Sequence, residues 1–216
     1  MPEQLRLIAL TGRAGAGKDS VAATLVRHLN YRSIAFADAL RAEIAQAWRI
    51  DARMLQDPAA KELDIPTLAI GNCCDTEFMW HAAEFECDLT RPNSPRWIMQ
   101  RWGDFQKQRH GRDYYAATVA HWIKRQIGAG WRRLVVTDMR FVLELESLRR
   151  MSDRLRTVRV LRPGQGIATA SQHASETELI GVATHSGLLN DGTLQDLVNA
   201  TLRMEASLWT DGKVAA

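Results

Sequence analysis

Gly12, Gly17 and Lys18 occur at the spacing G-x-x-x-x-G-K within the stretch TGRAGAGKDS. The stretch lies between an apolar run and a segment with helical periodicity, which is the context that this motif needs to form a phosphate-binding loop. Glycines let successive backbone N–H groups point at a phosphate, and the lysine adds positive charge near the β and γ phosphates. The sequence therefore predicts a site for ATP. The residues expected to contact it in this loop are Gly12, Arg13, Ala14, Gly15, Ala16, Gly17, Lys18, Asp19 and Ser20.

An acid, Asp19, stands directly after Lys18, where a hydroxyl that contacts magnesium is expected. A carboxylate beside triphosphate oxygens would be repelled unless a cation lay between them, so Asp19 is expected to face Mg²⁺ or one of its waters. The hydroxyl of Ser20 remains available to a phosphate or to the metal. The alternative is that Asp19 only caps the first helical turn and compensates its dipole.

A second acid, Asp138, ends the apolar segment LVVTD, and Arg140 follows two residues later. An acid at the end of a buried strand is similar to the second magnesium-organising element of P-loop enzymes. Open α/β sheets bind ligands at the carboxyl ends of their strands, so Arg140 is expected to contact a bound anion. The alternatives are a helix cap for Asp138 and a solvent-exposed arginine for Arg140.

These residues require an alternation of strands and helices. Strands are predicted at Leu5–Thr11, Tyr31–Ala37, 132–138 and 155–161, and helices at Lys18–Leu29, Ala39–Trp48, Pro95–Lys107, 113–128, Phe141–Met151 and after a capping box of Thr193 and Asp196. The pattern predicts an α/β fold of the P-loop NTPase type, with a mostly parallel sheet flanked by helices. Residues 49–95 are poorly periodic, apart from a helical piece at Thr76–Phe85. We expect one domain over 1–216, with a core at about 1–50 and 113–216 and a helical, substrate-binding insertion at about 51–112.

The composition of the 216 residues is that of a globular protein, and the net charge is only +3. No apolar run approaches the roughly 20 residues that span a bilayer, and the start lacks the basic head of a signal peptide, so a cytoplasmic location is expected. The cysteines show no CxxC spacing and are expected to be ordinary thiols, the alternative being a crowded zinc site of Cys73, Cys74, Cys87 and His81. Basic residues outnumber acids six to one between Arg91 and Arg112, which suits small phosphates, nucleic acid or a solvated face.

Several motifs occur in one order along the chain: GRAGAGKDS, SPRWIMQRWGDF, GRDYYAATVA, VVTDMRF, LRPGQG, QHASETEL and NDGTLQDL. In this order they resemble the phage-type deoxynucleoside monophosphate kinases, which are P-loop nucleotide kinases, over nearly the whole chain except about 49–90. That family also has an aspartate after the lysine of the loop. The resemblance implies transfer of the γ-phosphoryl group of ATP to a deoxynucleoside monophosphate, with Mg²⁺, to give the diphosphate and ADP.

The resemblance also implies roles for individual residues. Lys18, Asp19, Asp138 and Arg140 would be catalytic, with Asp19, Ser20 and Asp138 toward the metal. The acceptor would be held by Asp38, Arg41, Arg96, Trp97, Gln100, Arg101 and Arg140, and ATP also by Arg162, Asn190, Gly192 and Thr193. A phosphomonoester is already an anionic nucleophile, so this reaction needs arginines that align two anions and no catalytic base.

Parts of the resemblance are weaker. The run THSGLL, 184–189, departs from the acidic and β-branched residues expected before NDGT, which leaves the local strand and the adenine contacts open. His173 and Glu176 echo a family motif, but a lone histidine is more often structural. Trp97, Trp102 and Trp122 have helical spacing and are more often core residues than stacking platforms.

Two other functions compete with this one. A P-loop kinase for another small acceptor, such as dephospho-coenzyme A or phosphomevalonate, would share the loop and its aspartate. A nucleic-acid-binding NTPase would use the basic residues between Arg91 and Arg112 on a phosphate backbone, with a steep salt dependence. The chain has no recognised DNA-binding motif, so the expected partners are ATP and a deoxynucleotide, without nucleic acid or membrane. The accepted bases, the choice between ribose and deoxyribose and a possible homodimer are not decided by the sequence.

Overall fold

The computed structural model describes residues 4–57, 59–85, 88–164, 178–179 and 181–210. The chain divides into two compact units, Met1–Phe36 with Val119–Ala216 and Ala37–Thr118. We call them the first unit and the second unit. The insertion expected at about 51–112 falls inside the second unit, which also takes in most of one helix before it and the start of another after it.

The first unit contains a parallel sheet, in which the described residues form five strands in the order β2-β3-β1-β4-β5. The strands are β1 Arg6–Thr11, β2 Arg32–Ile34, β3 Arg133–Val136, β4 Leu155–Leu161 and β5 Ser186–Leu189. β1 lies at the centre, and its residues 7–10 are completely buried, as expected of a parallel strand covered on both faces. The predicted α/β class with a parallel sheet is thus confirmed.

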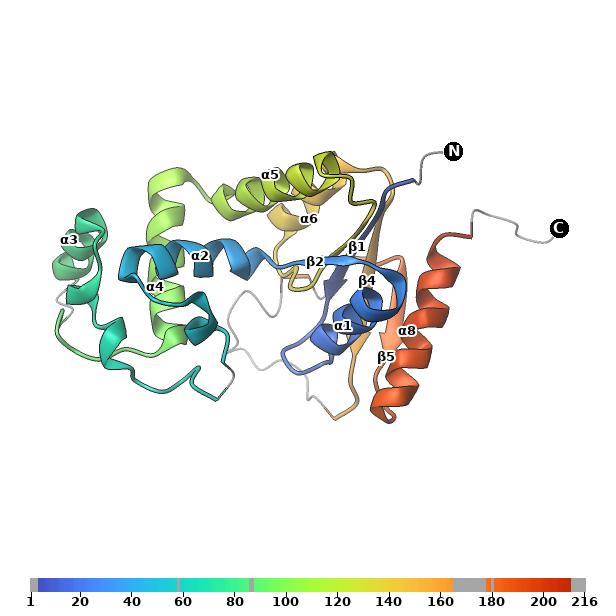
Figure 1. The fold of residues 1–216 in the computed structure, drawn as a ribbon, viewed down its shortest axis with the longest axis horizontal. Helices are drawn as coiled ribbons and strands as arrows, with labels where there is room; N and C mark the ends of the chain where they lie inside the picture. Colours follow the sequence, from blue (N-terminus) through green and yellow to red (C-terminus); the bar gives the residue numbers. More distant parts are fainter. Residues whose placement is uncertain (1–3, 58, 86–87, 165–177, 180, 211–216) are drawn as a thin grey trace. The chain divides into compact units, whose positions relative to one another are not determined.

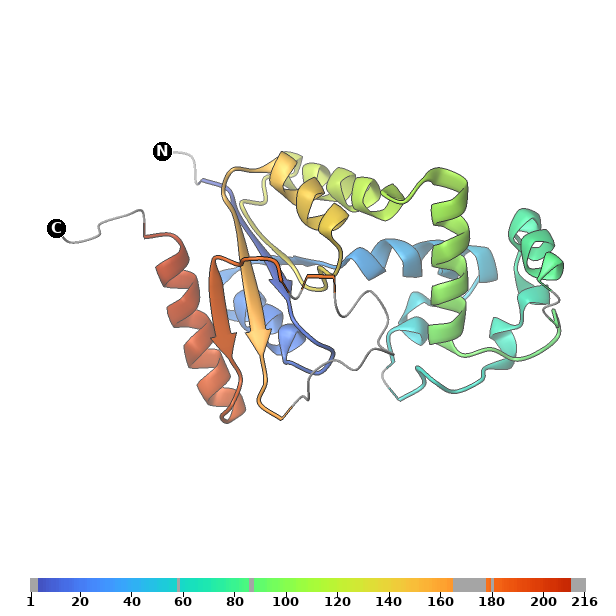
Figure 2. The same ribbon diagram turned by 180° about the vertical axis from the view of Figure 1, so that it is seen from behind.

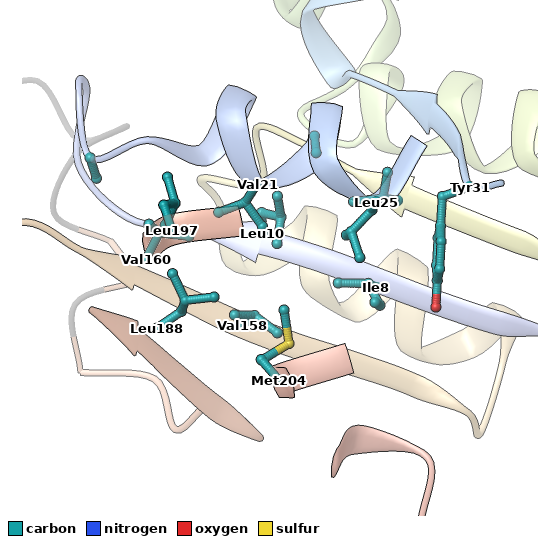
Figure 3. Packing of buried hydrophobic residues seen from close by; sticks show 13 residues of the cluster. Ile8, Leu10, Val21, Leu25, Tyr31, Val158, Val160, Leu188, Leu197 and Met204 are labelled. Carbon is teal, nitrogen blue, oxygen red and sulfur yellow. The ribbon is translucent and has the colours of Figure 1, made fainter. Parts of the chain in front are cut away.

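Helices cover both faces of this sheet. α1, Lys18–Leu29, and α8, Leu194–Leu208, lie over one face (Figure 1). Figure 3 shows side chains of the sheet, such as Leu10 and Val158, meeting Val21 and Leu25 of α1 and Met204 of α8. α6, Val142–Met151, and the part of α5, Tyr114–Gly128, that belongs to the first unit cover the other face (Figure 2).

The second unit is helical and has its own core. It contains α2, Phe36–Trp48, from its second residue, α3, Thr76–Glu84, and α4, Pro95–His110, together with short 3-10 turns at Ala52–Leu55, Pro66–Leu68 and Ile70–Asn72. Four aromatic rings, those of Trp48, Phe78, Trp102 and Phe105, pack edge to face or tilted, with centroids 5.0–6.0 Å apart. Trp102 is therefore a core residue, as predicted.

The predicted boundaries differ most around β2 and α2. A strand was expected over Tyr31–Ala37 and a helix from Ala39, but β2 ends at Ile34 and α2 begins at Phe36. The reason is tertiary, because the Asp138 carboxylate accepts a hydrogen bond from the N–H of Phe36 at 2.7 Å. This bond satisfies an N–H group at the start of α2 that the helix itself cannot bond.

No helix within the described ranges is long and apolar enough to cross a membrane.

Candidate functional site

The glycine-rich loop connects β1 to α1 in the first unit, and its backbone excludes side chains at two positions. Gly12 has φ +135°, and a Cβ there would lie 2.3 Å from the carbonyl oxygen of Val160 in β4. Gly17 has φ +104°, and a Cβ there would lie 2.5 Å from Nδ2 of Asn190. Both positions therefore require glycine for conformation and for space.

The Lys18 side chain lies along the inside of this loop. It is buried, and its Nζ donates hydrogen bonds to the carbonyl oxygens of Gly12 at 2.7 Å and of Arg13 at 2.8 Å. The ammonium group is thus held where the loop curves, with its charge beside the N–H groups that a phosphate would meet. This arrangement is one that a phosphate-binding loop uses.

Two residues from the ends of other strands reach the loop. Nδ2 of Asn190, which follows β5, donates to the carbonyl oxygen of Ala16 at 2.9 Å. Nη1 of Arg162, which follows β4, donates to the carbonyl oxygen of Gly15 at 3.4 Å. The structure thus brings together three segments that the sequence singled out for ATP. The amide of Asn190 acts on the loop itself.

Asp19 and Ser20 lie in the first turn of α1. Gly17, the N-cap residue, offers no side-chain cap, and Asp19 is the acid of that first turn, with an exposed side chain. Thr193 lies at the start of α8, where it forms the predicted capping box with Asp196. Its N–H donates to Oδ2 of Asp196 at 2.9 Å, so the helix cap uses this threonine.

Asp138 and Arg140 follow β3, next to the loop that follows β1. The connections from these two neighbouring strands leave in opposite directions, to β2 and to β4, which makes this the switch point where open α/β sheets bind ligands. Oδ1 of Asp138 accepts the N–H of Phe36 at 2.7 Å. The side chain of Arg140 is exposed. The helix that follows takes its cap from a different acid.

That acid is Glu144, whose buried carboxylate oxygen Oε2 accepts the N–H groups of Arg140 at 2.7 Å and of Phe141 at 3.0 Å. Burial raises the pKa of Glu144 to about 8, and the charge of Asp138 adds to the rise. The two backbone donors oppose it because they favour the ionised form. Because the N-cap residue is Phe141 and not Ser or Thr, the sequence lacks the capping-box signature that would have predicted this role for Glu144.

The residues expected to bind the acceptor, apart from Arg140, lie in the second unit. On α2, Nη1 of Arg41 pairs with Oδ1 of Asp38 at 2.8 Å, while Nε of Arg41 is buried without a partner in the structure. On α4, the guanidinium of Arg101 lies over the ring of Trp97 at 5.4 Å. The structure therefore groups these four residues into two pairs.

The other two expected acceptor residues, Arg96 and Gln100, are exposed on α4. Arg96 forms an ion pair with Glu62. Arg109, in the same basic stretch, pairs with Glu77 at 2.9 Å. Acidic partners thus already accompany part of the basic cluster that was considered for nucleic acid.

A carboxylate hub in the second unit was not foreseen. Glu43 of α2 accepts hydrogen bonds from Nε1 of Trp102 at 3.0 Å and from the hydroxyls of Tyr114 and Tyr115 at 2.8 Å each. Burial raises the pKa of Tyr114 to about 12, and Glu43 adds to the shift. No sequence pattern links Glu43 to residues so far along the chain. Glu43 fastens α2 to α4 and to the start of α5.

Three expectations concern residues outside the described ranges. His173 and Glu176 lie there, as does Cys87 of the alternative zinc site. Among the residues that the structure describes, no group of three or more His, Cys, Asp and Glu side chains could hold a metal ion.

Comparisons with known proteins add support for the fold. No protein-family model matches the chain, and no curated protein does. Solved structures do match: TT1252 from Thermus thermophilus has 19% identity and a TM-score of 0.50, over 96% of this chain and 99% of that one. A sugar kinase from a Janibacter species has 14% identity and a TM-score of 0.46, over 94% and 95% of the two chains. The fold is therefore similar to that of TT1252.

Proposed function

We propose that the chain is a kinase that transfers the γ-phosphoryl group of ATP to a deoxynucleoside 5′-monophosphate. The observation that carries the proposal is the loop between β1 and α1, with Lys18 held inside it by two loop carbonyls. Glycine is required at both of its ends for space and for backbone conformation. This geometry supports binding of a triphosphate, and the resemblance of the ordered motifs supports the acceptor class.

The donor would be bound by the loop, with Arg162 and the segment Asn190–Thr193 beside it. Lys18 would leave its loop carbonyls for the β and γ phosphates, since a bound anion offers stronger charge-assisted hydrogen bonds. Arg140 would lie on the transferred group or on the acceptor phosphate. The arginines of the second unit, Arg41, Arg96 and Arg101, would bind the acceptor, with Asp38, Trp97 and Gln100 toward its sugar and base.

Magnesium fits the donor set, because Asp19, Ser20 and Asp138 offer carboxylate and hydroxyl oxygens, which are the hard ligands that this ion prefers. When bound, the ion would neutralise charge on the β and γ phosphates. The chain's own residues would align the triphosphate of ATP with the acceptor phosphate for in-line transfer and would exclude water.

The test is ADP formation from ATP and Mg²⁺ with each of the common nucleoside monophosphates, in the ribose and deoxyribose forms, and with dephospho-coenzyme A and phosphomevalonate. We expect turnover that depends on an added deoxynucleoside monophosphate. Turnover with either of the last two acceptors and none with a nucleotide would assign the chain to another class of small-molecule kinase. ATP hydrolysis that rises with added DNA and falls steeply with salt would instead indicate a nucleic-acid-dependent NTPase.

A further inference from the structure

Two acidic side chains accept the three successive backbone N–H groups that lead into α6, Val142–Met151. Glu144 accepts those of Arg140 and Phe141, and the next one, of Val142, donates to Oε1 of Glu178 at 2.8 Å. A helix start leaves its first N–H groups without partners inside the helix, so side-chain oxygens are favourable acceptors there. These three N–H groups are therefore already bonded to the protein's own acids. They are not available to a phosphate bound near Arg140.

The two acids come from different parts of the chain. Glu144 belongs to α6 itself and is close in sequence to the residues that it caps, whereas Glu178 is 36 positions from Val142. A local cap forms wherever the helix forms. The bond from Glu178 forms only when its segment is docked against α6.

Leu179 and Val182, which lie after Glu178 in the sequence, are bonded to the sheet. Nη2 of Arg159, in β4, donates to the carbonyl oxygens of Leu179 at 2.5 Å and of Val182 at 2.7 Å. Leu179 is buried, and it lines a small space together with Thr11 at the end of β1 and Met139 beside Arg140. The residue that follows Glu178 is thus bonded to β4, and Glu178 itself accepts the N–H at the start of α6.

We propose that Glu178 is a positioning residue for Arg140, acting through the backbone of residues 140–142. Asp138, before Arg140, is bonded to Phe36; Glu144 accepts the N–H of Arg140 itself, and Glu178 accepts that of Val142 after it. These bonds fix the backbone on both sides of Arg140, so the exposed side chain of Arg140 extends from a backbone that is held in place. The inference deepens the proposed function, on which its kinetic test rests.

The kinetic test removes the hydrogen bond between Val142 and Glu178 in two ways. Glu178→Ala removes the acceptor, and Val142→Pro removes the donor at the first helical position, where proline is tolerated. We expect each to lower kcat/KM by about tenfold, with the loss mainly in kcat, because a misplaced Arg140 loses transition-state contacts. Glu178→Gln, which keeps an acceptor oxygen, should stay within about threefold of the wild type.

Background variants separate positioning from a general loss of structure. In an Arg140→Ala background, Glu178→Ala should change kcat/KM by less than about twofold, because the group that it positions is gone. Glu146→Ala, which removes an exposed acid from α6, should leave the rate unchanged. Equal losses from Glu178→Ala with and without Arg140 would overturn the proposal, as would Val142→Pro with full activity.

A measurement without an acceptor keeps this inference separate from the proposed function. Hydrogen exchange of the Val142 amide, followed by NMR, should speed up by about tenfold or more in Glu178→Ala if the bond protects it. If the wild type phosphorylates no acceptor, the proposed function fails, and the exchange result alone decides whether Glu178 holds α6. Unchanged exchange of Val142 in Glu178→Ala would overturn the contact itself.

Discussion

At the scale of a single residue, Lys18 has an observed place in the loop and a proposed role in the reaction. Its ammonium bonds two carbonyl oxygens of the loop, and the proposed function moves it onto a phosphate. We expect Lys18→Ala to lower kcat/KM by about a hundredfold or more, since the charge that it meets develops in the transition state. Far-ultraviolet circular dichroism and urea denaturation should show a folded protein. Near-normal turnover of a folded variant would remove Lys18 from the reaction.

Substitution of Asp19 distinguishes between two roles for this residue, a metal ligand and a helix cap. It is exposed in the first turn of α1, whose N-cap residue is a glycine without a side chain. We expect Asp19→Ala and Asp19→Asn both to raise the Mg²⁺ concentration for half-maximal rate and to lower kcat, because each removes the charge that would hold the ion. Asparagine keeps much of the capping ability. If Asp19 were only a helix cap, Asp19→Asn would therefore lower the free energy of unfolding by about 1 kcal/mol or less and leave the Mg²⁺ dependence of the rate unchanged. A wild-type Mg²⁺ titration in Asp19→Asn would contradict the metal role.

At the scale of elements, β5 shows how a strand forms from an unfavourable sequence. Its residues, SGLL, lack β-branched side chains, and the run before them departs from the pattern of the resembling kinases. The ring of His185 compensates, because its Nδ1 accepts the backbone N–H of Thr157 at 3.0 Å. The backbone N–H of His185 donates to the Thr157 carbonyl at 2.9 Å. The side chain thus extends the pairing with β4 by one acceptor. Because Nδ1 accepts a backbone N–H, the proton of the neutral ring lies on Nε2.

Through this bond we expect the stability of the fold to depend on pH. Burial lowers the pKa of His185, and Arg156 and Arg149 lower it further, so the folded state prefers the neutral ring. The unfolded state binds the proton more readily, so the contribution of His185 is present above its unfolded pKa, about 6.5, and is lost as the pH falls below it. We expect the wild type to lose free energy of unfolding relative to His185→Asn between about pH 7.5 and 5.5. Urea denaturation across that range measures the difference, and parallel curves for the two proteins would refute this account.

The sequence predicted which helices and strands form better than it predicted the residues at which they begin and end. The strands and helices around the loop were found because apolar periodicity and turn residues are local signals. The first turn of α2 was not, because its N–H group at Phe36 is satisfied by Asp138, 102 positions away. The candidate site follows the same division: the loop motif singled out Lys18 and Asp19, whereas the contacts of Glu43 and Glu178 form between segments that folding brings together.

At the scale of the whole molecule, arginines near the starts of strands in the first unit donate hydrogen bonds to the C-terminal carbonyl oxygens of helices. In a parallel α/β sheet the helices run opposite to the strands, so their negative C-terminal ends gather at the edge where the strands begin. Arg133 donates to the carbonyl oxygen of Leu29 at the end of α1, at 3.1 Å, and Nε of Arg156 donates to that of Leu208 at the end of α8, at 3.3 Å. Part of the excess of basic residues is therefore structural. Composition alone could not separate these arginines from Arg140.

The same edge holds a buried acid whose removal should lower stability without touching the reaction. Oε1 of Glu205, in α8, accepts Nη1 of Arg6 and the hydroxyl of Tyr31 at 2.8 Å each, which joins three distant segments of the first unit. The acid is 4% exposed, so Glu205→Ala leaves two donors without their partner and should lower the free energy of unfolding by about 2–4 kcal/mol. Glu146→Ala, at an exposed position, should change it by less than about 0.5 kcal/mol. Because Arg6 begins the strand whose far end carries the glycine-rich loop, the rate per folded molecule should stay at the wild-type value in Glu205→Ala. Urea denaturation together with ADP formation measures both quantities, and a rate that falls while the protein remains folded would show that this network also acts on the site.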